Sequence, residues 1–407
     1  MQKAPISLRM LVYLVLCYAL FGCGPPDFGD SEAGLVLQDL ASGLTTSRLE
    51  AQTPAPVVSE ISYRALGESR VADLYVSPEG ARAGIVLVPG VVARGKDDPR
   101  LVAVARSLAR ARFAVLVPDM PGVRSFRMRA SDAREVADAF AWLVTQPELS
   151  PQGRAGIAGF SYGAAPVLIA ALQPDIRQRV RFLLCVGGYY NLRQVVTYIT
   201  TGFYLVVDEL GTARRKRSQP HPYALGVFTR SNLDLLERPA DRRALRRYAD
   251  YLLGQGIGDD EPVIGKLGPD ARAFYDLLSN QDPQRVAGLL QQLPPRIRGE
   301  LDGIDPSAQD LIRLQAQVLL LHGRGDNLIP YTESLALAQA LPPDQVQLFV
   351  IDGLAHVDLR PEPQDLPQLL GILQALLTQR LPEDNPRLPG KQREEPTRHH
   401  SPGIMQD

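Results

Sequence analysis

Apolar residues along this chain fall into short continuous runs, separated by longer segments in which apolar positions recur every three or four residues. The short runs are typical of strands buried on both faces, and the longer period is typical of amphipathic helices. The runs predict strands at residues 84–88, 113–117, 154–158, 182–186, 317–322 and 345–351. The periodic segments predict helices at residues 101–112, 132–144 and 164–172. Strands alternating with helices indicate an α/β fold, with a mostly parallel central sheet and helices on both faces.

Two other parts of the chain depart from this alternation. Residues 57–64 and 71–76 predict two opening strands that pair antiparallel. Between the strand at 182–186 and that at 317–322, residues 191–311 show no convincing strand period. Helices separated by turns containing Pro or Gly are expected there, at residues 241–253, 271–278 and 286–293.

The segment Gly159-Phe160-Ser161-Tyr162-Gly163 fits the nucleophile-elbow pattern G-x-S-x-G. It lies between a predicted buried strand and a helix rich in small residues, which is the context that the pattern requires. A turn this sharp holds its central residue at positive φ and crowds its neighbours, so glycine is favoured at Gly159 and Gly163. We therefore expect Ser161 to be a nucleophile exposed at the end of the strand.

A serine nucleophile needs a base, and the base needs an acid that orients it. Asp326 follows one predicted strand and His356 follows the next, so the chain order is Ser161, Asp326, His356. His322 is a rival base, but it precedes Asp326 by four residues on the same loop and is better interpreted as bracing that turn. Asp352 and Asp358 flank His356 and are poor rivals for Asp326, because sequence neighbours rarely face the ring nitrogen.

With these motifs in this order, the chain resembles the α/β-hydrolase family over roughly residues 55–190 and 312–380. The resemblance implies a hydrolase core of residues 54–190 and 312–380, with residues 191–311 inserted as a helical cap over the active site. It implies two oxyanion-hole amides, those of Tyr162 and Val91. Pro89 stands where the family often has histidine, which argues weakly against bulky tertiary-alcohol esters.

The N-terminus predicts export. Lys3 and Arg9 precede an apolar run at residues 10–21, which is too short to span a bilayer and matches the core of a signal peptide. The next residues, Leu20-Phe21-Gly22-Cys23, resemble the bacterial lipobox. The resemblance implies a signal peptide over residues 1–23, acylation of Cys23 and anchoring in the cell envelope. Because Gly24 follows the cysteine, the outer membrane is the expected membrane. An uncleaved anchor or an ordinary secretory signal are the alternatives.

Composition adds expectations about the chain ends, partners and cofactors. Residues 24–53 and 381–407 are rich in polar residues, Pro and Gly, and we expect a flexible tether and a disordered tail. A net charge of −1 gives no reason to expect nucleic acid as a partner. No metal constellation is evident, and the proposed chemistry needs no cofactor. Cys185 lies in an apolar strand and is expected to be a small buried residue.

Three functions remain open at this stage. The first is a membrane-anchored serine hydrolase that cleaves an ester or similar small acyl compound through an acyl-enzyme. The second is a serine peptidase or acyltransferase using the same three residues. The third is a surface binding protein on an inactive hydrolase fold. Basic runs at residues 214–217 and 242–247 are expected to be solvated, with contact to anionic lipid headgroups as the alternative.

Overall fold

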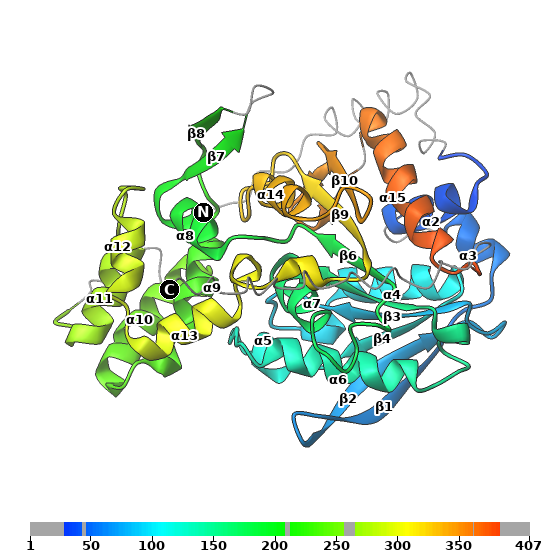
Figure 1. Cartoon of the computed structure of the whole chain (residues 1–407), viewed down its shortest axis with the longest axis horizontal. Helices are drawn as coiled ribbons and strands as arrows, with labels where there is room; N and C mark the ends of the chain where they lie inside the picture. The colour runs from blue at the N-terminus through cyan, green and yellow to red at the C-terminus, as the bar shows by residue number, and fades with distance from the viewer. Residues whose placement is uncertain (1–27, 43–45, 208–211, 256–264, 361, 383–407) are drawn as a thin grey trace, which may run out of the picture.

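The computed structural model describes residues 28–42, 46–207, 212–255, 265–360 and 362–382. Eight strands form one central sheet in the order β1-β2-β4-β3-β5-β6-β9-β10 (Figure 1). The strands are β1 Val57–Ala65, β2 Glu68–Val76, β3 Ala83–Val88, β4 Phe113–Pro118, β5 Ala155–Phe160, β6 Phe182–Val186, β9 Gln317–Gly323 and β10 Val346–Ile351. β1 and β2 pair antiparallel, β2 joins β4 antiparallel, and all later pairs are parallel. The predicted α/β fold with an antiparallel start is confirmed.

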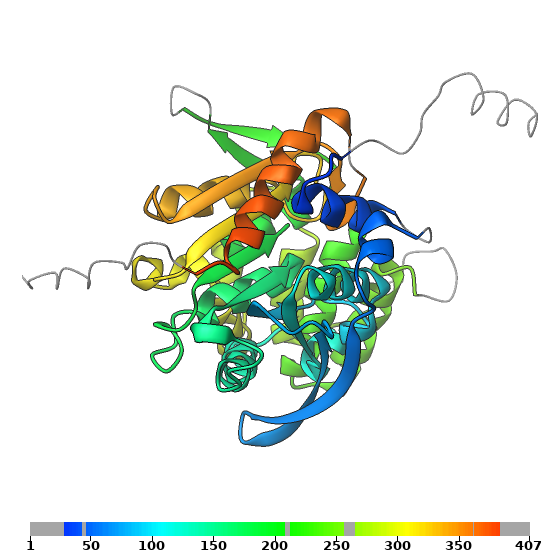
Figure 2. The same ribbon diagram turned by 90° about the vertical axis from the view of Figure 1, so that its right-hand side faces the viewer.

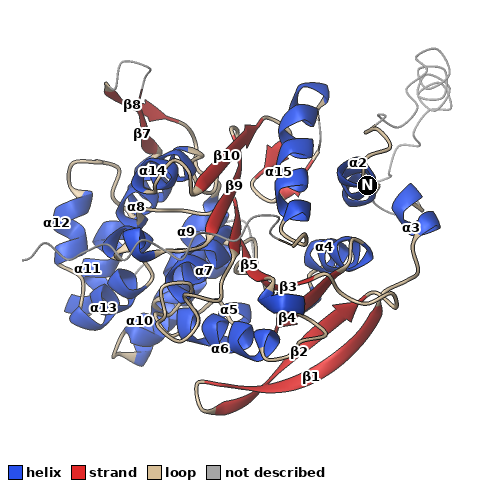
Figure 3. Ribbon diagram, turned by 45° about the vertical axis from the view of Figure 1, so that its right-hand side comes forward, coloured by secondary structure: helices blue, strands red, loops and turns tan. Residues whose placement is uncertain are grey.

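Helices cover both faces of the sheet (Figure 3). α6 and α7 pack on one face, and α4 and α15 pack on the other. These helices are α4 Pro99–Arg110, α6 Asp132–Val144, α7 Ala164–Ala170 and α15 Leu366–Thr378, while α14 Thr332–Ala340 lies beside β9 and β10. β3 and β4 are buried at every position, because side chains on both faces of each strand meet a helix layer. The carboxyl ends of the parallel strands therefore open at a single edge, where the loops carry the predicted site.

The segment between β6 and β9 is mainly helical. Its helices are α8 Leu192–Thr201, α9 Pro222–Ser231, α10 Pro239–Leu252, α11 Pro269–Leu278, α12 Val286–Gln291 and α13 Pro295–Gly303. It also contains two strands, β7 Phe203–Val207 and β8 Ala213–Arg217, which pair antiparallel and project from the body (Figure 1). No strand was expected here: the basic run of β8 conceals the alternation that normally indicates a strand.

The structure differs from the flexible tether expected over residues 24–53. Described residues there form α2 Glu32–Ala41 and α3 Arg48–Gln52, and α2 lies beside α15 (Figure 2). Val36 and Leu37 have no exposed surface, and Glu32 forms an ion pair with Arg380 at 2.7 Å. The polar composition of this stretch concealed the short apolar run that anchors it. Residues 1–27 and 383–407, with the expected lipobox and most of the expected tail, lie outside the described residues. Within the described ranges, no helix combines the length and apolarity needed to cross a bilayer.

Candidate active site

Ser161 lies at the first position after β5, in a sharp turn into α7. Its φ is 54°, as the elbow pattern predicts, and such a conformation is strained for a residue with a side chain. A Cβ on Gly159 would come within 2.4 Å of the Gly163 carbonyl oxygen, and one on Gly163 within 2.6 Å of the Pro89 oxygen. Both glycines are therefore required by close backbone contact, and together they allow the turn to hold Ser161 at the strand end.

Asp326 lies in the loop after β9, and its side chain is fully buried. One carboxylate oxygen, Oδ1, accepts the backbone N–H groups of Leu328 at 2.8 Å and Ile329 at 3.0 Å. The other, Oδ2, is 2.8 Å from Nδ1 of His356 and 3.2 Å from Nε2 of His322. Burial alone would raise the pKa of Asp326, but the hydrogen bonds to His322 and His356 outweigh it and hold the pKa well below its ordinary value. The carboxylate is thus ionised and fixed in orientation.

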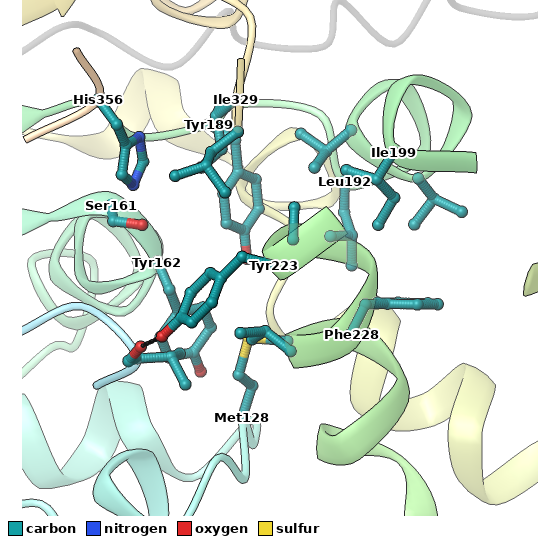
Figure 4. Close-up of a pocket in the computed structure, with 16 residues that line it drawn as sticks. Met128, Ser161, Tyr162, Tyr189, Leu192, Ile199, Tyr223, Phe228, Ile329 and His356 are labelled. Atoms are coloured by element: carbon teal, nitrogen blue, oxygen red, sulfur yellow. Dashed lines mark hydrogen bonds between the residues drawn. The ribbon is translucent and has the colours of Figure 1, made fainter. Parts of the chain in front are cut away.

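His356 occupies the first position of a two-residue loop between two very short strands, β11 Leu354–Ala355 and β12 Asp358–Leu359. Its φ is 58°, because tight hairpin loops of this length need positive φ at the first loop position. Nδ1 is hydrogen-bonded to Asp326, and Nε2 has no hydrogen-bond partner among the residues that the structure describes. Figure 4 shows the imidazole pointing toward the Ser161 side chain. The three residues predicted from sequence are therefore brought together at one strand edge.

The rival residues have other partners. His322 is completely buried, with Nδ1 2.7 Å from the Ser334 hydroxyl and Nε2 3.0 Å from the Ile329 carbonyl, so it braces the acid loop as expected. Asp352 pairs with Arg324 at 3.2 Å, and Asp358 pairs with Arg100 at 2.9 Å. Neither aspartate hydrogen-bonds to His356 among the described residues.

The residues expected to supply the two oxyanion amides lie near Ser161. Val91 and Tyr162 both line the pocket at the serine. Tyr162 follows the serine at the start of a helical turn, where N–H groups have no acceptor within the helix. The Val91 amide has no hydrogen-bond acceptor in the described part of the chain. Tyr223, at the start of α9, donates its hydroxyl to the Val91 carbonyl at 2.7 Å and thereby holds that loop.

The Tyr162 side chain is also anchored. Its hydroxyl donates to Oδ2 of Asp132 at 2.6 Å, and both groups are buried. Burial raises the pKa of Asp132 to about 6, against the opposing hydrogen bond from Tyr162. The residue expected to supply one oxyanion amide is therefore fixed at its side chain as well as by its backbone turn.

Two connected pockets meet at Ser161 and His356. The inner one has a free volume of about 90 Å³, and apart from Ser161, His356 and three tyrosines it is lined by aliphatic residues, Met and Phe. Half of its lining residues come from α8 and α9 (Figure 4). The outer pocket, of about 440 Å³, is more polar and includes Asp98, Arg100, His221 and Asn327. An apolar group on one side of the serine and a more polar group on the other would fit this arrangement.

No cluster of side chains suited to a metal ion is present among the described residues. Cys185, in β6, is buried away from the pockets, and burial raises the pKa of its thiol to about 12. The thiol is consequently protonated and is no nucleophile at neutral pH.

Comparison with known proteins places this geometry in a family. The profile of the alpha/beta hydrolase fold family matches residues 85–363, well over half of the chain. The chain belongs to this family. No curated protein matches the sequence.

Solved structures give the same fold at low sequence identity. A Legionella pneumophila protein proposed to be a hydrolase is 14% identical, with a TM-score of 0.55 over 87% of this chain and 96% of that one. A dienelactone hydrolase-like promiscuous phosphotriesterase from metagenomic libraries is 15% identical, with a TM-score of 0.42 over 80% and 98%. A puromycin-hydrolyzing peptidase of Mycobacterium tuberculosis is 15% identical, with a TM-score of 0.45 over 80% and 38%. The likeness to the Legionella protein supports the fold and assigns no substrate.

Sequence reasoning missed two parts of this site. Tyr223 lies in the inserted segment, and nothing in its local sequence indicates that it reaches Val91. Asp132 was identified only as the start of a helix, yet it holds the Tyr162 hydroxyl. Both contacts join segments distant in sequence, so only the folded chain reveals them.

Proposed function

We propose that this hydrolase cleaves an ester or a related acyl bond through an acyl-enzyme on Ser161. The observation that carries the proposal is the connection of His356 to the buried Asp326 carboxylate at 2.8 Å, with the imidazole pointing toward Ser161 (Figure 4). An alcohol next to a neutral imidazole that is held in one tautomer can be deprotonated as it attacks.

The proposed reaction has two halves. The Ser161 oxygen bonds to the acyl carbon while its proton passes to Nε2 of His356. The negative charge on the former carbonyl oxygen is stabilised by the amides of Val91 and Tyr162. The leaving group then departs with the proton from His356, and water repeats the sequence to release the acid. Asp326 stays ionised and stabilises the imidazolium in both halves.

The pocket supports a substrate with a compact apolar group. The inner pocket offers only about 90 Å³ beside Ser161, with a wall of aliphatic and aromatic side chains. We infer that α8 and α9 act as a cap that shapes this pocket. A small or short-chain acyl group is accommodated there, and a more polar leaving group lies in the outer pocket.

A fluorophosphonate probe followed by a substrate panel tests the proposal. One probe should be bound per chain, and Ser161→Ala should bind none. Short-chain p-nitrophenyl esters should be hydrolysed faster than long-chain esters and faster than aminoacyl p-nitroanilides. Faster cleavage of the anilides would identify a peptidase, and transfer to an added alcohol in preference to water would identify an acyltransferase. A chain that binds no probe would be a binding protein on the hydrolase fold.

We also propose that the chain is exported and acylated at Cys23, which would place it in a bacterial cell envelope, anchored in the outer membrane. The support is the lipobox-like Leu20-Phe21-Gly22-Cys23 after an apolar run. Intact mass of the detergent-extracted protein tests this, because a chain beginning at diacylated Cys23 has a defined mass. Cys23→Ser should leave the precursor unprocessed, and a wild-type chain still beginning at Met1 would contradict the proposal.

A further inference from the structure

The β7–β8 hairpin forms one wall of a groove that no step of the proposed reaction uses. The groove has a volume of about 370 Å³ and lies between the hairpin, α8 and the segment leading into α12. Its wall includes Arg193, Gln194 and Thr197 of α8 and Phe203, Leu205 and Arg215 of the hairpin. It shares no residue with the two pockets at Ser161. The groove is therefore a separate feature of the surface.

The groove is positively charged. Arg193 and Arg215 contribute two guanidinium groups, and no carboxylate of a described residue lines it. Neither arginine forms an ion pair within the described part of the chain, although the same chain pairs many of its other arginines with carboxylates. From Phe203 to Arg217 the sequence has four basic residues against two acidic ones, a net charge of +2. A chain with a net charge of −1 thus concentrates positive charge at this place.

The same face of the hairpin carries apolar side chains. Strand pairing sets Phe203 opposite Arg217, Leu205 opposite Arg215 and Val207 opposite Ala213, and alternation places these six residues on one face. Leu205 is 38% exposed and Val207 is 48% exposed. The guanidinium of Arg217 lies 5.4 Å from the centre of the Phe203 ring. Exposed aliphatic groups among guanidinium groups suit a boundary between water and hydrocarbon better than bulk water.

We propose that this groove binds the surface of an anionic phospholipid bilayer. A headgroup phosphate lies between Arg193 and Arg215, where guanidinium groups can donate paired hydrogen bonds to its oxygens. Leu205 and Val207 then meet the acyl boundary, and Arg217 adds to the attraction for the negative surface. Charge complementarity carries the choice of ligand, because apolar contact alone would not distinguish a lipid surface from a protein.

A single tryptophan placed in the hairpin tests the binding locally. Trp142, in α6, is the only tryptophan of the chain, so the full-length double variant Trp142→Phe, Leu205→Trp reports only on the hairpin. Its fluorescence is followed with vesicles of dibrominated phosphatidylglycerol or dibrominated phosphatidylcholine. We expect quenching and a blue shift with the anionic lipid, roughly twofold or more above the zwitterionic lipid, and a decrease of the difference at high salt.

Two further variants in this reporter background decide the result. Arg193→Gln with Arg215→Gln should abolish the preference for the anionic lipid, a loss of roughly 10-fold or more in local affinity. The matched control, Arg243→Gln with Arg247→Gln, removes two exposed charges from α10 and should preserve it. Circular dichroism verifies that each variant is folded. Equal quenching by both lipids would overturn the proposal, and so would a preference for the anionic lipid that survives the loss of Arg193 and Arg215. Quenching by neither lipid would also overturn it, and would favour a protein surface as the occupant of the groove.

Discussion

His322 and His356 approach the same oxygen of Asp326, Oδ2, at 3.2 Å and 2.8 Å. One of these histidines is completely buried, and the other faces the pocket. Two donors on one carboxylate oxygen, with two backbone N–H groups on the other, leave the acid no freedom to rotate. In the proposed mechanism the two histidines therefore have different tasks: His322 holds Asp326 in place, and His356 is the base that Asp326 orients.

This division predicts different outcomes for the two alanine variants. His356→Ala should lower kcat by about 10⁴-fold or more, because the base is lost, while stability changes little. His322→Ala should keep measurable turnover but lose roughly 1–3 kcal/mol of stability, because Ser334 and Asp326 lose a buried partner. Turnover and urea unfolding measure the two effects. An inactive His322→Ala beside an active His356→Ala would reverse the assignment.

Asp326→Asn removes the negative charge of the Asp326 side chain and keeps its shape. We expect kcat to fall by about 10⁴-fold, because an amide cannot stabilise the imidazolium. The pKa of Asp326 is lower in the folded chain than in the unfolded chain, so its contribution to stability is present above the unfolded value near pH ~4 and is lost as pH falls through the folded value. The variant should therefore be less stable at pH 7 and lose less stability on acidification. Urea unfolding at pH 7 and at low pH measures this, and equal pH dependence in both chains would contradict it.

The positive φ of Ser161 predicts that a glycine variant is more stable than an alanine variant at this position, the reverse of the usual order. Ser161→Ala keeps a Cβ at a φ of 54°, whereas Ser161→Gly relieves the strain. The glycine variant should be the more stable of the two by about 1 kcal/mol, although glycine usually destabilises. Denaturant unfolding measures the difference. Ala165→Gly in α7, where φ is helical, is the control and should show the ordinary loss.

Glu333, in α14, carries a prediction about pH. It is buried, and its Oε2 accepts the N–H groups of Tyr190 at 3.1 Å and Asn191 at 2.7 Å. Burial raises the pKa from 4.5 to about 7, so the folded chain retains a proton that the unfolded chain releases. The resulting stability is present below pH 4.5 and is lost as pH rises through about 7. Glu333→Gln should flatten this decline, by on the order of 1–3 kcal/mol. Thermal unfolding between pH 4 and 8 measures it, and an unchanged slope would contradict it.

Tyr223→Phe tests whether the inserted segment supports the oxyanion site. The variant loses the hydrogen bond to the Val91 carbonyl, which is 2.7 Å long, while the ring still fills the pocket. We expect kcat to fall roughly 2- to 10-fold with KM for a short ester little changed, the equivalent of one hydrogen bond. Tyr251→Phe, on α10, is the control. A rise in KM alone, without a change in kcat, would show that Tyr223 acts on substrate fit instead.

Much of the architecture could be predicted from local patterns, and the exceptions have physical reasons. Buried strands such as β3 and β4 have apolar runs that need no long-range information, and the elbow motif indicates the strain at Ser161 directly. Contacts between side chains from distant segments have no local sequence pattern that would indicate them, as the contacts of Tyr223 and Asp132 show. β8 was missed because its basic side chains are all exposed, so it has no apolar alternation to detect.

The packing of α2 on α15 limits how far the enzyme could stand from a membrane. The described part of the chain begins at Phe28, whose side chain is buried, five residues after Cys23. Even fully extended, five residues reach no more than about 17 Å. A chain acylated at Cys23 would therefore keep Phe28 within that distance of the lipid surface, so the hydrolase would meet its substrates next to the bilayer and not far out in bulk solution.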